Sequence, residues 1–429
     1  MVHIAVIGGG PKAAALAAKA AAIRASTFAD ITITIFEKDA IGAHWSGASG
    51  YTDGIQDLCT SASRDVAFPD NSVYGPLANA KMAQYSWAAF LRNRVAQTSY
   101  HRWIDAGSRS ESHAVFSEYL YWVIVESEAN AVKGTVHYLE PVGGRWKVHF
   151  RSRDDELQVH GQLFDGVVVT GPGEPNDFIR ATADPGLSFP TQRMFNGKDF
   201  WLRLDEMGER IKDLTHSPVE DPIVVVGAGG TGAAIMAWLV KNGARDLPLQ
   251  LVTELAAIYT RVDSVFENRL FSDETLWPLL PATKQDEFYD RTNRGVVWNK
   301  VNAVLETATN LSYAYGRATE KKVTAADGFH LLVDGATTQY TIVPAVLIDA
   351  TGFNRWWFLD LLILDPNPDT VAWEEGIGFH LELVGTPWKG LPPLHAPMCS
   401  RKQGPGFGSL MVLGAMSDRI LSMHAPPGG

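Results

Sequence analysis

Two glycine-rich turns are the parts of this chain whose residue types and spacing are best suited to chemistry. The first turn spans residues 8–13, reads Gly-Gly-Gly-Pro-Lys-Ala, and directly follows the β-branched run His3–Ile7. An alanine-rich stretch of helical composition extends from it to about Ala25, and the strand predicted for Ile31–Glu37 ends in an acid. This order matches the GxGxxA fingerprint of a dinucleotide-binding βαβ unit.

Each position of this fingerprint has a physical role. Gly8 allows the sharp turn, Gly10 lets a pyrophosphate approach the backbone, and Ala13 lets the helix pack closely on the strand. The helix N-terminus offers free N–H groups and the positive end of its dipole. Glu37 stands where a carboxylate accepts both ribose hydroxyls. The plainer interpretation is a glycine turn in an unrelated α/β domain.

A second copy of the pattern lies in the middle of the chain. The strand predicted for Ile223–Val226 leads into a turn that reads Gly-Ala-Gly-Gly-Thr-Gly, a helix through Val240 follows, and Leu249–Thr253 is the next predicted strand. Two such units imply two dinucleotides, commonly FAD on the first and a nicotinamide nucleotide on the second. The alternative is a duplicated fold whose second site has lost its ligand. The residues expected to hold the second nucleotide are Gly227, Gly229, Thr231 and Gly232.

Two apolar strands that end in Thr-Gly bracket the second unit. One is Val167–Val169, and the other is Val346–Ala350, which Thr351 and Gly352 follow. The segment between residues 174 and 221 is rich in proline, glycine and charge, as expected of a connector. The nicotinamide domain is therefore predicted as an insertion. The predicted α/β fold has two nested Rossmann-like domains and a small substrate-binding helical region, with an FAD-binding domain at 1–175 and 345–429 and a nicotinamide-binding domain at 195–344.

Composition and spacing exclude several classes of protein. The formal net charge of −11 disfavours nucleic acid as a partner. The only cysteines, Cys59 and Cys399, form no CxxC pair, which excludes the disulfide reductases and indicates a reducing compartment. The histidines show no metal-binding spacing, and the N-terminus has no signal-peptide core. The uncharged stretch 222–240 predicts a strand, a turn and a helix rather than a membrane span. We expect a cytoplasmic, metal-free protein.

Phrases along the whole chain add a family resemblance. The first turn has the GxGP form, with Pro11. The other phrases are His44-Trp45, Gly50–Gly54, Thr60–Val66, Asp263–Phe271, Arg291–Val297, Gln403–Phe407 and Leu413–Ser422. In this order they resemble the siderophore-type flavin-dependent amine N-hydroxylases, above all the mycobactin-type lysine N6-hydroxylases. The resemblance implies FAD, NADPH, O2 and a small-molecule amine substrate, reaction through a C4a-hydroperoxyflavin with no catalytic residue beyond the flavin, and members that often associate as homo-oligomers.

The resemblance also assigns substrate contacts. Arg64 stands where the family usually has a lysine that holds the substrate carboxylate, and arginine adds a bidentate grip. Asn268 is implied to contact the substrate backbone groups, and Asn293 lies in the strip beside it, within a substrate-contacting segment at about 263–300 of the NADPH domain. The plainer interpretations are a surface ion pair between Arg64 and Asp65, and a helix-cap or turn role for Asn268.

Further residues are implied to contact the cofactors. Trp45 follows the acid-ended strand, as a tryptophan does in the family. Ser417 and Leu421 belong to the closing helix, which is implied to lie against the flavin and the substrate. Thr351 and Gly352 are the remaining expected cofactor contacts. Core packing of Trp45 and a simple strand-ending turn at residues 351 and 352 are the plainer interpretations.

The implied reaction needs an unprotonated amine. The side-chain pKa of lysine is near 10.4, so deprotonation at pH 7 costs roughly 4.6 kcal/mol. A desolvated pocket can supply this free energy, because burial disfavours the ammonium form. We therefore expect apolar walls around the amine, with Phe266, Phe271 and Trp277 as wall residues and core packing as the alternative.

The identity of the nicotinamide nucleotide depends on two residues beyond the predicted strand Leu249–Thr253. Arg261 is suitably placed to meet the 2′-phosphate of NADPH, whereas Glu254 would suit the free ribose of NADH. The family resemblance implies NADPH, which we favour.

Several rival functions stay open at this point. Cys59 stands where ornithine hydroxylases place a glutamine near the flavin, which favours lysine, but ornithine, a diamine, another amine or a ketone are alternative substrates. A rival of another class is an NAD(P)H-dependent flavoprotein reductase that passes electrons to a protein partner, which the missing cysteine pair disfavours. A third rival function is that of a flavin-bound scaffold without catalytic activity.

Overall fold

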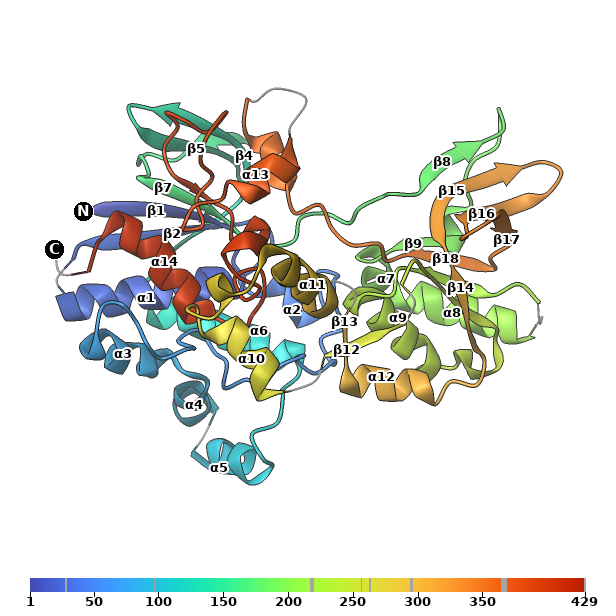
Figure 1. Cartoon of the computed structure of the whole chain (residues 1–429), viewed down its shortest axis with the longest axis horizontal. Coiled ribbons are helices and arrows are strands. Elements are labelled where there is room, and N and C mark those ends of the chain that lie inside the picture. The colour runs from blue at the N-terminus through green and yellow to red at the C-terminus, as the bar shows by residue number, and fades with distance from the viewer. Residues whose placement is uncertain are drawn as a thin grey trace. The chain divides into compact units, whose positions relative to one another are not determined.

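The computed structural model describes residues 1–27, 29–95, 97–216, 220–255, 257–261, 264–293, 296–363 and 369–427. The chain forms two compact units, and Figure 1 labels many of the elements of both. Unit 1 consists of Met1–Gly173, Val265–Pro281 and Arg355–Gly429. Unit 2 consists of Glu174–Ser264 and Ala282–Asn354.

Unit 1 is built on a parallel sheet with the strand order β19-β7-β1-β2-β3. Strand β1 (Val2–Ile7) and strand β2 (Ile31–Glu37) pair in parallel, and helix α1 (Pro11–Thr27) makes the crossover between them. The alanines of α1 are small enough for the helix to lie close to the sheet. The other strands are β3 (Asn130–Lys133), β7 (Gly166–Val169) and β19 (Leu394–His395).

An antiparallel sheet of β4 (Thr135–Val142), β5 (Arg145–Arg151) and β6 (Leu157–Val159) completes the strands of unit 1. Large aromatic side chains, among them Trp146 and Phe358, fill the core between its elements. The helices and helical turns of unit 1 after α1 are α2 (Ala43–Ser46), α3 (Pro76–Met82), η1 (Ala83–Tyr85), α4 (Trp87–Phe90), η2 (Leu91–Val95), α5 (Gln97–Asp105), α6 (His113–Glu126), α10 (Val265–Ser272), η5 (Trp277–Leu279), η6 (Trp357–Leu361), α13 (Thr370–Glu375), η7 (Pro397–Cys399), η8 (Arg401–Gln403) and α14 (Leu413–His424).

Unit 2 repeats the parallel architecture with the strand order β14-β11-β10-β18-β9. Helix α9 (Gly230–Lys241) connects β10 (Ile223–Val226) to β11 (Leu249–Thr253), and its apolar residues pack into the core of this unit. A mixed sheet in the order β17-β16-β15-β8 and the pair β12-β13 complete the strands.

The remaining strands of unit 2 are β8 (Arg180–Ala183), β9 (Met194–Asn196), β12 (Tyr259–Arg261), β13 (Val296–Trp298), β14 (Leu311–Tyr315), β15 (Arg317–Thr324), β16 (Gly328–Asp334), β17 (Gln339–Ile342) and β18 (Val346–Asp349). Its other helices and helical turns are η3 (Thr191–Arg193), α7 (Asp199–Leu202), α8 (Leu204–His216), η4 (Ala244–Asp246), α11 (Ala282–Asn293) and α12 (Asn299–Glu306).

The two βαβ units appear where the sequence predicts them. Each has a parallel strand pair with a helix that starts at the glycine-rich turn, so the predicted α/β class with two Rossmann-like units is confirmed. The uncharged stretch 222–240 is divided between β10 and α9. Among the described residues, no helix has both the length and the apolar character needed to cross a membrane.

The unit boundaries differ from the expected ones. Strand β18, expected at the return to the first domain, instead pairs with β10 in the sheet of unit 2, and the chain re-enters unit 1 at Arg355. The segment 174–221, expected to be a connector, supplies two strands of unit 2. Strand β8 pairs with β15, and strand β9 pairs with β18. The expected substrate-contacting segment is divided, because Val265–Pro281 belongs to unit 1 and the chain from Ala282 belongs to unit 2.

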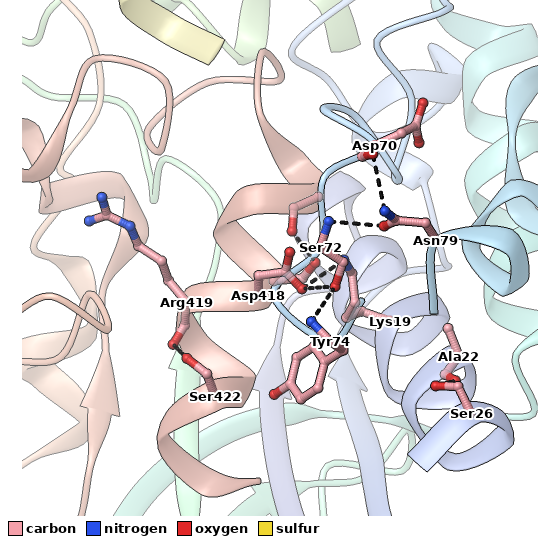
Figure 2. Close-up of polar contacts among 12 residues, drawn as sticks. Lys19, Ala22, Ser26, Asp70, Ser72, Tyr74, Asn79, Asp418, Arg419 and Ser422 are labelled. Carbon is pink, nitrogen blue, oxygen red and sulfur yellow. Dashed lines mark hydrogen bonds and ion pairs between the residues drawn. The ribbon is translucent and has the colours of Figure 1, made fainter. Parts of the chain in front are cut away.

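A buried ion pair joins the first helix of unit 1 to its last (Figure 2). Lys19 of α1 is 1% exposed, and its Nζ donates to Asp418 Oδ1 of α14 at 2.7 Å. The hydroxyl of Ser72 donates to the same oxygen at 2.7 Å, and the Ser72 N–H donates to the side-chain oxygen of Asn79. Residues almost 400 positions apart therefore share one buried polar cluster, in which the Asp418 carboxylate balances the charge of Lys19 away from water.

We expect Lys19→Met to lower the free energy of unfolding by about 3 kcal/mol, because it leaves the Asp418 carboxylate buried without its cation. Urea denaturation measures the change. Lys212→Met is the matched control, since Lys212 pairs with Glu209 on the exposed face of α8, and its loss should cost less than about 1 kcal/mol. Equal effects of the two substitutions would contradict the role of the buried pair.

Candidate nucleotide and substrate sites

The first glycine turn leaves room for a ligand at the N-terminus of α1. Gly8 has φ 101°, and a Cβ there would lie 2.5 Å from Thr170 Oγ1, so only glycine fits beside β7. A Cβ on Gly10 would meet no atom within 4 Å, so this side of the turn is open. Pro11 begins the helix, where its missing N–H costs nothing, and Ala13 is fully buried. An open backbone turn at a helix N-terminus fits a pyrophosphate.

Glu37 is held beside this turn. Its Oε2 accepts the Gly9 N–H at 2.6 Å, and its Oε1 accepts the Asp39 N–H at 2.8 Å. Each carboxylate oxygen has a second lone pair available for a ribose hydroxyl. The residues of unit 1 therefore fit both the pyrophosphate and the ribose of a dinucleotide such as FAD.

Trp45 belongs to α2 and forms an aromatic group with residues of α6. Its ring packs edge-on against His113 at 4.9 Å and Phe116 at 5.3 Å. Burial lowers the pKa of His113 to about 4, and its Nδ1 lies 2.7 Å from Thr52 Oγ1. This environment agrees with the packing interpretation of Trp45, and its contact with a flavin stays a prediction.

The second glycine turn packs even more closely. A Cβ on Gly227, at φ 105°, would lie 2.5 Å from the Ala350 carbonyl oxygen, and a Cβ on Gly232 would overlap the Gly227 carbonyl. Gly229 is the N-cap of α9 and offers no side-chain acceptor, which leaves the first N–H groups of the helix to a ligand. Thr231 lies in the first turn of this helix. The turn fits the pyrophosphate of a second nucleotide.

Thr351 and Gly352 follow β18 at the edge of this turn. Asp349 Oδ1 accepts both the Thr351 N–H at 3.1 Å and the Thr351 hydroxyl at 2.6 Å, and Gly352 has φ 110°. Burial raises the pKa of Asp349. Asp349 thus positions the Thr-Gly turn, a role that only its side-chain contacts reveal. Arg261 ends β12 opposite Trp298, and the neighbouring Val262 and Asp263 lie outside the described residues.

Arg64 and Asp65 do not form the surface ion pair of the plainer interpretation. Asp65 is 7% exposed, its Oδ1 accepts the Ala67 N–H at 3.0 Å, and its Oδ2 accepts the Trp87 N–H at 2.8 Å. Burial raises the pKa of Asp65 to about 7. Arg64 Nη1 donates to Thr60 Oγ1 at 3.2 Å and to Met411 Sδ at 3.0 Å. Asp65 therefore positions the loop that presents Arg64.

The expected substrate residues occupy both units. Asn268 lies inside helix α10 of unit 1, so it is not a helix cap, and its Oδ1 is shielded from solvent. Asn293 is the last residue of α11 in unit 2, and the following Arg294 and Gly295 lie outside the described residues. Ser417 and Leu421 are fully buried in α14, and the Ser417 hydroxyl donates to the Gly414 carbonyl at 2.8 Å.

The three expected wall residues have different environments. Phe266 is 83% exposed, whereas Phe271 and Trp277 are buried. The Trp277 indole N–H donates to the Lys402 carbonyl at 3.1 Å. Burial within unit 1 agrees with the core-packing interpretation of Phe271 and Trp277, and a wall role for any of the three residues stays a prediction.

Arg419 anchors the segment that carries Asn268, and the sequence analysis did not single it out. Its Nε donates to Glu274 Oε2 at 2.6 Å, and its Nη1 donates to Gln403 Oε1 at 3.0 Å. The guanidinium also lies between the rings of Phe379 and Phe407, 4.3 and 4.4 Å from their centroids. A planar guanidinium can make all of these contacts at once. The only signal in the sequence was an arginine within the predicted closing helix.

No protein-family model matches the chain. L-lysine N6-monooxygenase MbtG of Mycolicibacterium paratuberculosis is 31% identical over 446 residues, which cover all of this chain and 96% of the relative. MbtG of Mycobacterium sp. (strain MCS) is 33% identical, with 97% and 94% coverage. This chain belongs to the MbtG family of L-lysine N6-monooxygenases. The predicted family resemblance is confirmed.

Two solved structures extend the comparison to three dimensions. Lysine monooxygenase NbtG of Nocardia farcinica, described with an NADPH domain, has a TM-score of 0.77 and 28% identity, with 97% of this chain and 98% of NbtG covered. The Kutzneria sp. 744 ornithine N-hydroxylase KtzI, solved with reduced FAD, NADP+ and L-ornithine, has a TM-score of 0.71 at 18% identity and 99% coverage of both chains. The second likeness establishes the shared fold.

We expect Arg419→Lys to loosen the segment 265–281, because an ammonium cannot replace the forked and stacked contacts of the guanidinium. Loss of about 1.4 kcal/mol of local stability would raise amide hydrogen exchange in this segment about tenfold. Arg269→Lys is the matched control, since Arg269 of α10 makes an exposed pair with Asp273 at 3.4 Å. Unchanged exchange in Arg419→Lys would refute the anchoring role.

Proposed function

We propose that this protein is an FAD- and NADPH-dependent monooxygenase that N-hydroxylates the side-chain amine of L-lysine, or of a lysine derivative, for the synthesis of a hydroxamate siderophore or a related natural product. Full-length similarity to the L-lysine N6-monooxygenases carries this proposal. The two glycine turns support it, since each leads directly into a helix N-terminus that can hold the pyrophosphate of one dinucleotide.

Unit 1 binds FAD in this proposal. The backbone at Gly10 and the N-terminus of α1 hold the pyrophosphate, and Glu37 accepts the ribose hydroxyls. The bound flavin, once reduced, supplies the activated oxygen that reaches the amine. The chain itself binds and orients the reactants and keeps water away from them.

Arg64 holds the substrate carboxylate. Its Nη1 already faces the neutral acceptors Thr60 Oγ1 and Met411 Sδ, and a carboxylate is a stronger acceptor than either. Asp65 keeps the loop in place through the backbone of Trp87 and Ala67. Asn268, on the anchored helix α10, contacts the backbone groups of the amino acid. The amine end is desolvated, which favours its neutral, nucleophilic form.

The proposal is tested by measuring hydroxylamine product and NADPH oxidation with free L-lysine, N-acylated lysine, L-ornithine and cadaverine. We expect hydroxylamine from lysine or its derivative in proportion to NADPH consumed. Hydroxylamine formed only from ornithine or only from cadaverine would show that this amine, and not lysine, is the substrate. Electron transfer to an artificial acceptor without hydroxylamine from any amine would favour the reductase.

In the same assay, Asn268→Ala should raise the apparent KM for the amine about tenfold with FAD still bound, because it removes one polar substrate contact. Thr275→Ala, in the exposed loop after α10, is the control and should leave KM unchanged. Amine kinetics that are the same for Asn268→Ala and the wild type would remove Asn268 from the substrate site.

Nicotinamide selection follows from Arg261. We expect Arg261→Gln to raise the KM for NADPH about tenfold to a hundredfold and to leave the KM for NADH unchanged, because only NADPH has a 2′-phosphate for the guanidinium. Glu254→Gln should preserve the preference for NADPH over NADH, since Glu254 Oε1 already pairs with Arg317 Nε at 3.8 Å. A wild-type preference for NADH would overturn this assignment.

A further inference from the structure

Helix α1 contains two buried lysines with different partners. Lys19 is paired with Asp418, as described above. Lys12 is 5% exposed, and its Nζ donates one hydrogen bond, to the Ser409 carbonyl at 3.0 Å. In the described part of the chain, no carboxylate oxygen lies within 4 Å of this nitrogen. An ammonium group has three N–H donors, so two donors of Lys12 are left for another acceptor.

The position of Lys12 within α1 makes its charge more costly. It is the second residue of the helix, where the positive end of the dipole disfavours a cation. Removal of a charge from water is also unfavourable unless it is paired. Burial accordingly lowers the pKa of Lys12 to about 7. Without an anion, the charge of a lysine at this position is unfavourable to the folded protein.

Charged groups on the elements packed against α1 are engaged elsewhere. Helix α1 contacts β2, α3, α6 and α14. Asp418 of α14 pairs with Lys19, and Glu37 of β2 accepts the N–H groups of Gly9 and Asp39. The acids of α6, Glu118 and Glu126, are exposed, and α3 contains no acid. Among the described residues, these four elements therefore provide no counter-charge for Lys12.

Gly10, at the open side of the glycine turn, precedes Lys12 by two residues in the chain. A Cβ on Gly10 would meet nothing within 4 Å, and the dinucleotide fingerprint brings a pyrophosphate to this backbone. A pyrophosphate would satisfy the free N–H donors of Lys12 and offset the unfavourable dipole. Two observations that are independent of each other, a buried lysine without a carboxylate partner and an open anion-binding turn, thus fall within two residues of each other at the start of α1.

We propose that Lys12 is a ligand of the FAD pyrophosphate, a role that rests on the proposed FAD site of unit 1. Its ammonium donates charge-assisted hydrogen bonds to the phosphate oxygens, and the cofactor anion favours the protonated form. Binding of FAD to the apo-protein therefore takes up a proton when the pH lies above neutrality. Lys12 is thus a cofactor-binding residue, whereas Lys19, seven residues on, serves the fold.

The experiment measures binding of FAD, and of ADP as a pyrophosphate without a flavin, to the apo-protein by titration calorimetry. We expect Lys12→Met to weaken both ligands about tenfold to a hundredfold and to leave apo-protein stability unchanged or higher, since it removes an unpaired buried charge. Lys12→Arg should retain most of the affinity. Lys19→Met is the matched control and should lower stability without weakening either ligand.

The pH dependence gives a second readout. Wild-type affinity for FAD should fall as the pH rises from about 7 to about 9, because free Lys12 loses its proton in this range and must regain it on binding. The fall should be absent in Lys12→Met, which has no titrating group, and in Lys12→Arg, which stays charged. A pH profile shared by all three proteins would overturn proton uptake at Lys12.

The outcomes separate this inference from the proposed function. If the wild-type protein does not bind FAD, both the proposed function and the role of Lys12 are overturned. If the wild type binds FAD and Lys12→Met binds FAD and ADP equally well, only the role of Lys12 is overturned. Loss of FAD affinity with unchanged ADP affinity would also overturn the pyrophosphate contact, because it would place the ammonium at the flavin end.

Discussion

Both nucleotide sites depend on one steric constraint, the close approach of a glycine turn to a neighbouring strand. In unit 1 the turn approaches Thr170 so closely that a side chain on Gly8 would collide with its hydroxyl. In unit 2 the same approach brings Gly227 against the Ala350 carbonyl. Only a residue without Cβ, and with access to positive φ, can bring the helix N-terminus to the end of the strand. The anion-binding end of each helix is positioned by this contact.

Long-range charge pairs then hold the surroundings of the first site together. The pair between Lys19 and Asp418 joins the N-terminal and C-terminal helices of unit 1, as Figure 2 shows. Arg419, the next residue of the same helix, anchors the segment that carries Asn268 through Glu274. Adjacent residues of α14 thus face two different parts of the unit. One turn of helix thereby connects the proposed FAD region with the proposed substrate region.

The contrast between Lys12 and Lys19 shows why burial alone does not define a role. The two side chains have the same chemistry and are both removed from water. A carboxylate pairs with Lys19, whereas Lys12 has no such partner among the described residues and follows the open glycine of the turn by two residues. The first arrangement is complete within the protein, whereas the second is the one that we propose a ligand completes.

The amino-acid sequence by itself determined the two βαβ units, because their strands, turns and helices are set by local periodicity and by glycine spacing over about 30 residues. The bounds of β2 and β11 agree with the predicted ones for this reason. The sequence also identified the family, since phrases typical of that family occur in order along the chain. Only the tertiary structure decided that β18 joins the sheet of unit 2, that Val265–Pro281 belongs to unit 1, and that Asp65 faces inward. These outcomes depend on hydrogen bonds and charge pairs between residues far apart in the chain, and local residue patterns do not contain that information.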